Sequence, residues 1–191
     1  VRFWPLLRGQ VLIPEIRMTR PDLLLETAPR KDQPGNWDFL GPSDGQPPVL
    51  QRLLIDDGRL QFLDAAGKTD ILVALNSGKP KNADSAPPLL VKGKGRWQGN
   101  PFTLDGNTES PLELSNSDHP FRIHLDGRAG ATHAIASGTL TNPFALRTFD
   151  LDFMLSGQDM EDLYPLVGLA IPSTPPYKLK GRLKRDNDVW R

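Results

Sequence analysis

The sequence predicts a mainly β protein: an elongated, curved antiparallel sheet, folded like an open groove or taco, with one short α-helix. Three observations indicate this fold. Several short segments alternate apolar and polar residues, which is the pattern of a strand with one apolar face. The 17 glycines and 19 prolines are scattered between these segments as turn signals. A single segment has helical spacing of its apolar residues.

The alternation is clearest in residues 149–156, where phenylalanine and leucine point to one side and aspartate to the other. Residues 121–126 repeat the pattern. So do residues 177–184, whose polar side is entirely basic. Each segment is long enough for one strand of ordinary length. We therefore expect strands with one apolar face and one polar face.

Turn chemistry predicts how these strands connect. Asp57-Gly58 suits a type I′ hairpin between residues 53–56 and the strand that begins at Arg59. Residues 65–68, 99–101 and 142–143 also read as turns, because each contains glycine or an Asn-Pro pair. Short connections favour antiparallel neighbours. The predicted topology is a meander of hairpins.

Two segments interrupt the meander. Residues 79–88 are polar and contain three prolines, so we expect a flexible loop there. In residues 159–169, Met160, Leu163 and Val167 have helical spacing, and acidic residues lie in the first turn. These residues form the one predicted helix. We expect residues 1–191 to be a single β domain that is cut from a longer protein at both ends.

Composition excludes several functions. Lysine plus arginine and aspartate plus glutamate both number 23, so the formal net charge is zero. Nucleic-acid binding usually needs a basic excess, and we expect none here. The absence of cysteine excludes disulfides, thiol nucleophiles and cysteine-ligated metals. The chain has no apolar run of about 20 residues, and no signal peptide is visible. We expect any membrane anchor to lie outside these residues.

No catalytic or metal site is predicted. His119, His124 and His133 lack helical metal-ligand spacing and are expected to be exposed. Asp56 and Asp57 belong to a turn. The pair at 150 and 152 shares the polar side of one strand, so a glycosidase with two carboxylates across a cleft is disfavoured. We expect no enzyme, no cofactor and no metal.

Other features have structural explanations. Lys92-Gly93-Lys94-Gly95 lacks the spacing of a phosphate loop and reads as a strand in which glycine allows strong bending. The basic side of residues 177–184 is expected to be solvated, although lipid headgroups or phosphates are an alternative. The four tryptophans, Trp4, Trp37, Trp97 and Trp190, are expected to pack in cores or turns.

The order of motifs carries a family resemblance. The chain opens with Trp4-Pro5-Leu6-Leu7-Arg8-Gly9, continues with Arg20-Pro21-Asp22-Leu23-Leu24-Leu25-Glu26 and then has Gly35-Asn36-Trp37-Asp38-Phe39. Near the other end, residues 149–157, 160–166 and 177–182, with Gly168 and Pro172, form a second set. This progression resembles the AsmA family of Gram-negative bacteria, including its TamB- and YhdP-related envelope proteins. The resemblance is weakest over residues 79–120.

The resemblance implies a location and a function. Such proteins are anchored in the inner membrane, project a β-rich body into the periplasm and are linked to outer-membrane biogenesis. The larger ones are regarded as apolar β grooves that carry phospholipid. For this chain the resemblance implies non-enzymatic lipid handling in the periplasm of a Gram-negative bacterium, with phospholipid acyl chains as the ligand.

Burial of a lipid tail contributes about 0.8 kcal/mol per CH₂, which totals on the order of 10 kcal/mol per chain without any charged group. The expected lining comprises the inward residues of the alternating strands: Leu60, Phe62, Ile71, Val73, Leu75, Phe102, Leu104, Phe121, Ile123, Leu125, Phe149, Leu151, Phe153, Leu155, Tyr177, Leu179 and Leu183. The alternative is a structural or protein-interaction module that assists outer-membrane protein assembly by strand addition at a sheet edge, with its apolar face packed shut.

Overall fold

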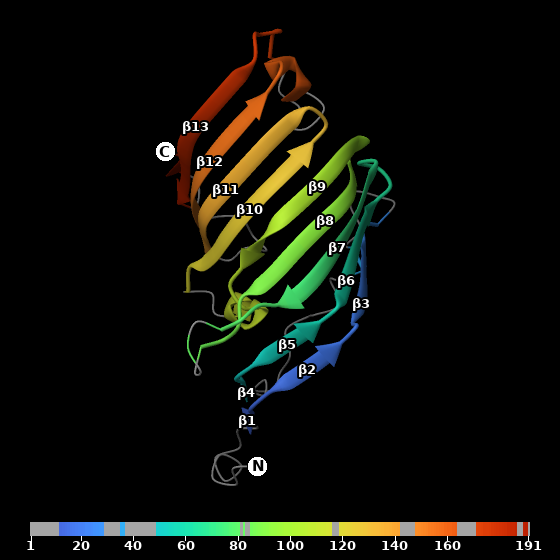
Figure 1. The fold of residues 1–191 in the computed structure, drawn as a ribbon, viewed down its shortest axis with the longest axis vertical. Helices are drawn as coiled ribbons and strands as arrows, with labels where there is room; N and C mark the ends of the chain where they lie inside the picture. Colours follow the sequence, from blue (N-terminus) through green and yellow to red (C-terminus); the bar gives the residue numbers. More distant parts are fainter. Residues whose placement is uncertain are drawn as a thin grey trace.

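The computed structural model describes residues 12–28, 35–36, 49–80, 82, 85–115, 119–141, 148–163, 171–186 and 189–190 (Figure 1). Strands dominate this part of the chain. The first six are β1 (Leu12–Ile13), β2 (Ile16–Thr19), β3 (Asp22–Glu26), β4 (Val49–Leu50), β5 (Leu53–Asp56) and β6 (Gly58–Asp64). The others are β7 (Thr69–Ser77), β8 (Leu89–Trp97), β9 (Asn100–Thr108), β10 (Phe121–Ala129), β11 (Thr132–Thr141), β12 (Thr148–Gly157), β13 (Tyr177–Asp186) and β14 (Val189–Trp190).

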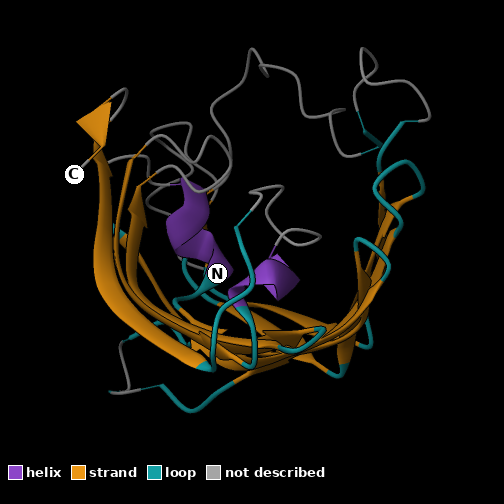
Figure 2. Cartoon of the chain, turned by 90° about the horizontal axis from the view of Figure 1, so that it is seen from above, coloured by secondary structure: helices purple, strands orange, loops and turns teal. Residues whose placement is uncertain are grey.

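Ten of these strands form one sheet in the order β14-β13-β12-β11-β10-β9-β8-β7-β6-β3. From β7 to β13 each strand pairs antiparallel with its predecessor, which confirms the predicted meander over this part of the chain. Figure 2 shows that the sheet curves strongly into a trough. The mainly β fold and the curved sheet predicted from the sequence are therefore correct.

The first strands depart from the prediction. β5 and β6 do not form a hairpin: β5 pairs parallel with β2, and β6 pairs parallel with β3. Asp57 has a positive φ of 53°, and so does Arg20 at 51° on the neighbouring chain segment. The segment from β2 to β3 and the segment from β5 to β6 thus bend at the same point. The Arg20 amide donates to the Asp56 carbonyl at 2.7 Å, which holds the bend.

Gly58 serves close packing and not the predicted type I′ turn. A Cβ atom added there would lie 2.7 Å from Cγ2 of Ile55. The type I′ geometry occurs instead between β8 and β9, where Gln98 and Gly99 both have positive φ, 49° and 82°. The hairpin predicted at Asp57-Gly58 is therefore wrong, because β5 and β6 each pair with a parallel strand, β2 and β3, and not with each other.

The predicted helix over residues 159–169 is also corrected. Its described part is a 3₁₀ turn, Met160–Leu163, and residues 164–170 lie outside the described part. The Asp159 carboxylate accepts hydrogen bonds from the backbone amides of Glu161 and Thr174, both at 2.9 Å, and from the Ser173 hydroxyl. These bonds join the turn to residues 173–174. They favour a tight turn at this point over regular helical propagation.

A second 3₁₀ turn, Pro111–Ser115, follows β9. Both turns lie on the concave side of the sheet in Figure 2. In the loop predicted at 79–88, the described residues form no strand, Asn82 and Ser85 bond to each other, and Pro87 is buried. The flexibility of this loop stays a prediction. Residues 142–143, and the motif residues 4–9 and 37–39, lie outside the described part.

Candidate functional site

The trough carries one continuous apolar face. Residues that are paired across antiparallel strands point to the same side, so the strand register assigns each side chain to a face. Four adjacent cross-strand rows, here called the central rows, contain no charged residue from β6 to β13. Their members are Gly58, Leu60 and Phe62; Ile71, Val73, Leu75 and Ser77; Leu89, Val91, Gly93 and Gly95; Phe102, Leu104, Gly106 and Thr108; Ile123, Leu125, Gly127 and Ala129; Thr132, Ala134, Ala136 and Gly138; Leu151, Phe153, Leu155 and Gly157; and Tyr177, Leu179, Gly181 and Leu183.

The structure places every residue of the predicted lining on this face. All belong to the central rows except Phe121 and Phe149, which lie in the next row, linked through Leu140. Whether they contact lipid stays a prediction. Sequence reasoning missed Leu89, Val91 and the small residues, because glycine and alanine hide the alternation. Counting glycine as an inward residue would have revealed the pattern in β8, where Val91, Gly93 and Gly95 alternate with Lys92 and Lys94.

Charge appears on this side of the sheet beyond the central rows. Asp64, paired with Thr69, follows Phe62 at one end, and Arg185, paired with Phe149, lies at the other. The opposite face of the sheet is mostly polar, as shown by the facing pairs Lys92–Asp105 and Asp152–Arg182. The apolar surface is therefore bounded by polar groups at the ends of the strands and by polar groups on its reverse side.

Glycines shape the floor of the trough. Gly95 and Gly138 have φ values of 145° and 153°, which side chains rarely adopt, and a Cβ at either would meet a backbone carbonyl of the next strand. At Gly181, an added Cβ would lie 2.9 Å from the Phe153 ring. The ring thus lies against the glycine of the neighbouring strand. Glycines at these points permit the curvature and keep the floor shallow.

The apolar face is covered in one region and open in another. Ile55 of β5 packs on Leu75 and Val91, and all three are 8% exposed. By contrast, no described apolar side chain of β11, β12 or β13 is buried. Leu179 is 43% exposed and Leu183 is 38% exposed. Within the described residues, the apolar face is therefore packed shut near β7 and β8 and accessible near β13.

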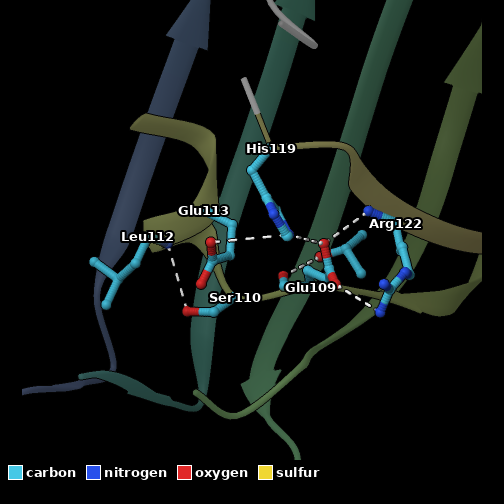
Figure 3. A network of polar contacts seen from close by, with 7 residues as sticks. Glu109, Ser110, Leu112, Glu113, His119 and Arg122 are labelled. Carbon is cyan, nitrogen blue, oxygen red and sulfur yellow. Dashed lines mark hydrogen bonds and ion pairs between the residues drawn. The ribbon is translucent and has the colours of Figure 1, made fainter. Parts of the chain in front are cut away.

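A pocket with charged residues in its lining lies at one end of the trough, and Figure 3 shows the polar contacts among some of these residues. It has a volume of about 610 Å³, and its lining includes Thr108, Ile123 and Gly138 as well as Glu113 of the Pro111–Ser115 turn. Glu109 anchors it: its carboxylate accepts a hydrogen bond from the Arg122 amide at 3.0 Å and pairs with the Arg122 guanidinium at 3.2 Å. The His119 ring approaches Glu109 at 3.3 Å. The end of the trough thus combines both charge signs beside an apolar floor.

The other histidines, and the Asp150 carboxylate, form contacts with neighbouring side chains. His124 contacts the Ser137 hydroxyl at 2.6 Å, and His133 contacts Asp126 at 2.7 Å. His124 is exposed, as the sequence predicts, whereas His119 and His133 are half-buried. Asp150 accepts two hydrogen bonds from Arg182, at 2.5 and 2.7 Å, and these bonds lower the pKa of the Asp150 carboxyl. Among the described residues, no three histidine or acidic side chains gather as a metal site.

One comparison with known proteins supports the family resemblance. The AsmA family protein YhjG of Escherichia coli (strain K12) is 29% identical to this chain over 203 residues. The match includes 93% of this chain but 29% of the length of YhjG. No protein-family model matches the chain, and neither does any solved structure. In the part of the chain described here, no helix is both long enough and apolar enough to cross a bilayer.

Proposed function

We propose that this chain, which belongs to the AsmA family, forms an apolar trough that holds lipid acyl chains as part of a non-enzymatic envelope protein. Family membership supports a role associated with the cell envelope. Lipid handling, and a periplasmic position within an inner-membrane-anchored parent protein, are the finer parts of the proposal. The observation that carries it is the run of central rows, which crosses eight consecutive strands without a charged residue.

The dimensions of this surface suit acyl chains. Eight strands at about 4.8 Å spacing cover an arc of roughly 34 Å, and four rows cover roughly 20 Å along the strands. One leaflet of a bilayer core is about 15 Å thick, which approximates the length that one acyl tail occupies in a membrane. The surface therefore has room for at least one tail. Several of its side chains are half-buried and accessible to a ligand.

The chemistry of the surface favours sliding over fixed binding. Leu104, Ile123 and Leu155 offer non-directional contacts, and glycine and alanine keep the floor low between them. Removal of a tail from water stabilises the complex by on the order of 10 kcal/mol, whereas no directional bond has to break when the tail moves. A transport path requires this combination, and a catalytic site does not.

The polar ends support a placement for the headgroup. Arg122 and His119 lie at the pocket beside Ile123, so a zwitterionic or anionic headgroup would meet polar partners while its tails lie on the central rows. Charged groups along the central rows would instead carry a desolvation cost against acyl chains. The arrangement thus separates the apolar path from its polar end.

Site-specific photo-crosslinking tests the proposal. A benzophenone side chain at Phe153 points into the trough, whereas one at Met154, the next residue of β12, points to the opposite face. The protein is mixed with vesicles of radiolabelled phosphatidylethanolamine and phosphatidylglycerol and then irradiated. We expect lipid adducts at position 153 and few at position 154.

Equal labelling at both positions would contradict the proposal, since it would show non-specific contact with lipid. So would the absence of adducts at 153 together with a purified protein from which organic extraction recovers no phospholipid by mass spectrometry. Retained circular dichroism of both variants shows that the probe has not unfolded the sheet.

A further inference from the structure

We propose that the trough docks on an anionic lipid bilayer through one end of its strands, where three hairpin turns lie next to one another. The turns are residues 65–68 between β6 and β7, residues 98–99 between β8 and β9, and residues 130–131 between β10 and β11. Together they are called the hairpin rim. The inference rests on the proposed function for its purpose, because a docked rim would give lipid a way into the trough.

Backbone hydrogen bonds join the three turns into one edge. The Gly99 amide donates to the Lys68 carbonyl at 2.8 Å, and the Gly130 amide donates to the Pro101 carbonyl at 2.9 Å. Figure 1 shows the three hairpins beside one another at the upper end of the sheet. Each turn is also closed by paired strands on both sides. The hairpin rim is therefore one continuous edge of defined shape.

The concave side of the hairpin rim is apolar and aromatic. Trp97 lies beside the turn at 98–99 and is 37% exposed. Its ring centroid is 6.3 Å from that of Phe102, a residue of the central rows. An indole favours the layer between acyl chains and headgroups, because its ring is apolar while its N–H donates a hydrogen bond. The apolar face thus continues up to the rim and ends there in an interfacial side chain.

The outer side of the hairpin rim is basic. Arg96 and Arg128 each lie two residues from a turn, about 7 Å along the strand, and Lys68 belongs to a turn. All three are exposed, and none forms an ion pair with a described residue. Strand alternation directs both arginines to the convex face. These cations are therefore available to lipid phosphates.

Two carboxylates lie near the hairpin rim, and both have hydrogen-bond donors. Asp64 accepts from the Gly67 amide at 3.0 Å. Asp70 is in register with Arg96 and accepts from the side-chain amide of Gln61 at 3.0 Å. The basic groups outnumber these two carboxylates, so the rim has a net positive charge.

The other ends of the same strands carry a different charge. Asp56 and Asp57 precede β6, and Glu109 follows β9, where it pairs with Arg122. Anionic lipid would meet carboxylates at that end. The rim also stops at β11, because the 3₁₀ turn that follows β12, Met160–Leu163, is acidic. Charge therefore selects the hairpin rim as the edge that faces an anionic surface.

An edge with these two sides suits the surface of an anionic bilayer. The arginines would meet lipid phosphates, while Trp97 enters the headgroup layer. Strands that stand on the membrane in this way hold the concave face open toward the acyl chains at Phe102. A lipid tail would then pass beside Trp97 onto the central rows without crossing a charged side chain.

Cosedimentation of the intact chain with vesicles tests the docking. Vesicles of phosphatidylcholine are compared with vesicles in which part of it is replaced by phosphatidylglycerol. We expect binding at least about tenfold tighter to the anionic vesicles. Arg96→Gln with Arg128→Gln should weaken that binding at least about tenfold, because each arginine near the surface contributes to the attraction.

A matched variant controls for general charge. Arg59→Gln with Lys184→Gln removes the same two positive charges from the outer face, about 20 Å along the strands from the hairpin rim. This distance exceeds the range of electrostatic attraction at moderate salt, so binding should stay within about twofold of the unaltered chain. Circular dichroism checks that both double variants are folded.

Fluorescence quenching locates the contact. Brominated acyl chains in the anionic vesicles quench an indole that enters the bilayer surface. The unaltered chain should be quenched, and Trp97→Phe should lose most of this quenching while it still binds the vesicles. Trp4, Trp37 and Trp190 are present in both proteins, so the difference reports Trp97 alone.

Three outcomes would overturn the proposal. Equal losses of binding in the two double variants would show general charge attraction. Unchanged quenching in Trp97→Phe would place the contact elsewhere. Tighter binding to polyglutamate than to anionic vesicles, with loss in Arg96→Gln with Arg128→Gln, would assign the basic side to an acidic protein.

The docking and the lipid path fail separately. Vesicle binding that depends on the hairpin rim, without lipid adducts at position 153, would support the docking and contradict the path. Adducts at position 153, with vesicle binding that is insensitive to both arginines and to Trp97, would support the path and overturn the docking.

Discussion

The strands around β7 and those around β13 carry the same alternation but differ in what covers them. In β7, Leu75 packs beneath Ile55 and is 8% exposed. In β13, Leu179 occupies an equivalent inward position and is 43% exposed. The register assigns both to the same continuous face. The difference arises because β5 crosses the face at one end, and no described strand does so at the other.

The contrast teaches that an apolar face is not by itself a core. Alternation determines which side chains share a side, whereas burial requires a second element at the right distance. The covered end supplies stability. The accessible end retains apolar surface that a ligand can bury. The proposed lipid path therefore depends on the end of the sheet that contributes least to the core of the chain.

The largest expected effect is a difference in stability between variants at these two ends of the sheet. Leu75→Ala should lower the free energy of unfolding by about 3 kcal/mol, because it removes packed methyl groups and leaves a cavity beneath Ile55. Leu179→Ala should cost less than about 1 kcal/mol, since that residue is 43% exposed and no described residue packs over it as Ile55 packs over Leu75. Urea denaturation of the two variants measures the difference. Equal losses would show that the β13 end is packed as tightly as the β7 end.

An intermediate effect is expected from the curvature of the accessible half. Gly138→Ala forces a side chain into a φ of 153° and against the Asp150 carbonyl, so stability should fall by about 1–3 kcal/mol. Gly127→Ala, one strand earlier, meets its nearest atom at 3.4 Å and should be neutral or stabilising by up to about 1 kcal/mol. Thermal denaturation distinguishes them. If Gly138→Ala were tolerated equally well, glycine would not be required for the bend.

The smallest expected effect concerns the outer face of the same half. Arg182 lowers the pKa of the Asp150 carboxyl in the folded protein, so the ionised form favours folding. This contribution is present above the ordinary pKa of 3.8 and is lost as the pH falls through the lowered folded value. Asp150→Asn should therefore be slightly less stable than the unaltered chain near neutral pH.

The two proteins should converge in stability as the pH falls below the lowered folded pKa of Asp150, because the carboxyl is then protonated. Denaturant midpoints over a series of pH values, from neutral to acidic, measure this. The control is Asp152→Asn, an exposed position on the same strand, which should show a smaller gap at neutral pH. A gap for Asp150→Asn that persists at low pH would assign the effect to something other than the Arg182 contact.

Much of the site was predictable because it depends on local periodicity. Phe153 and Leu155 alternate with polar residues, and antiparallel register carries that alternation across neighbouring strands. The N-terminal strands were not predictable in the same way. Asp57-Gly58 has the residues of a hairpin, but β5 pairs with a strand 37 positions earlier, as in Ile16 with Leu53. Nothing in the local sequence encodes a parallel partner at that distance.

The sequence by itself determined which residues share the apolar face and where the charge lies on the other. Period-two patterning and short turns are sufficient for that, because they act within a strand and between neighbours. The tertiary structure alone decided that β5 covers Leu75 and Val91 and that the Asn36 side chain bonds to Leu24 and Glu26 of β3. These features join segments distant in sequence, and their energies depend on packing and edge hydrogen bonds that no local pattern records.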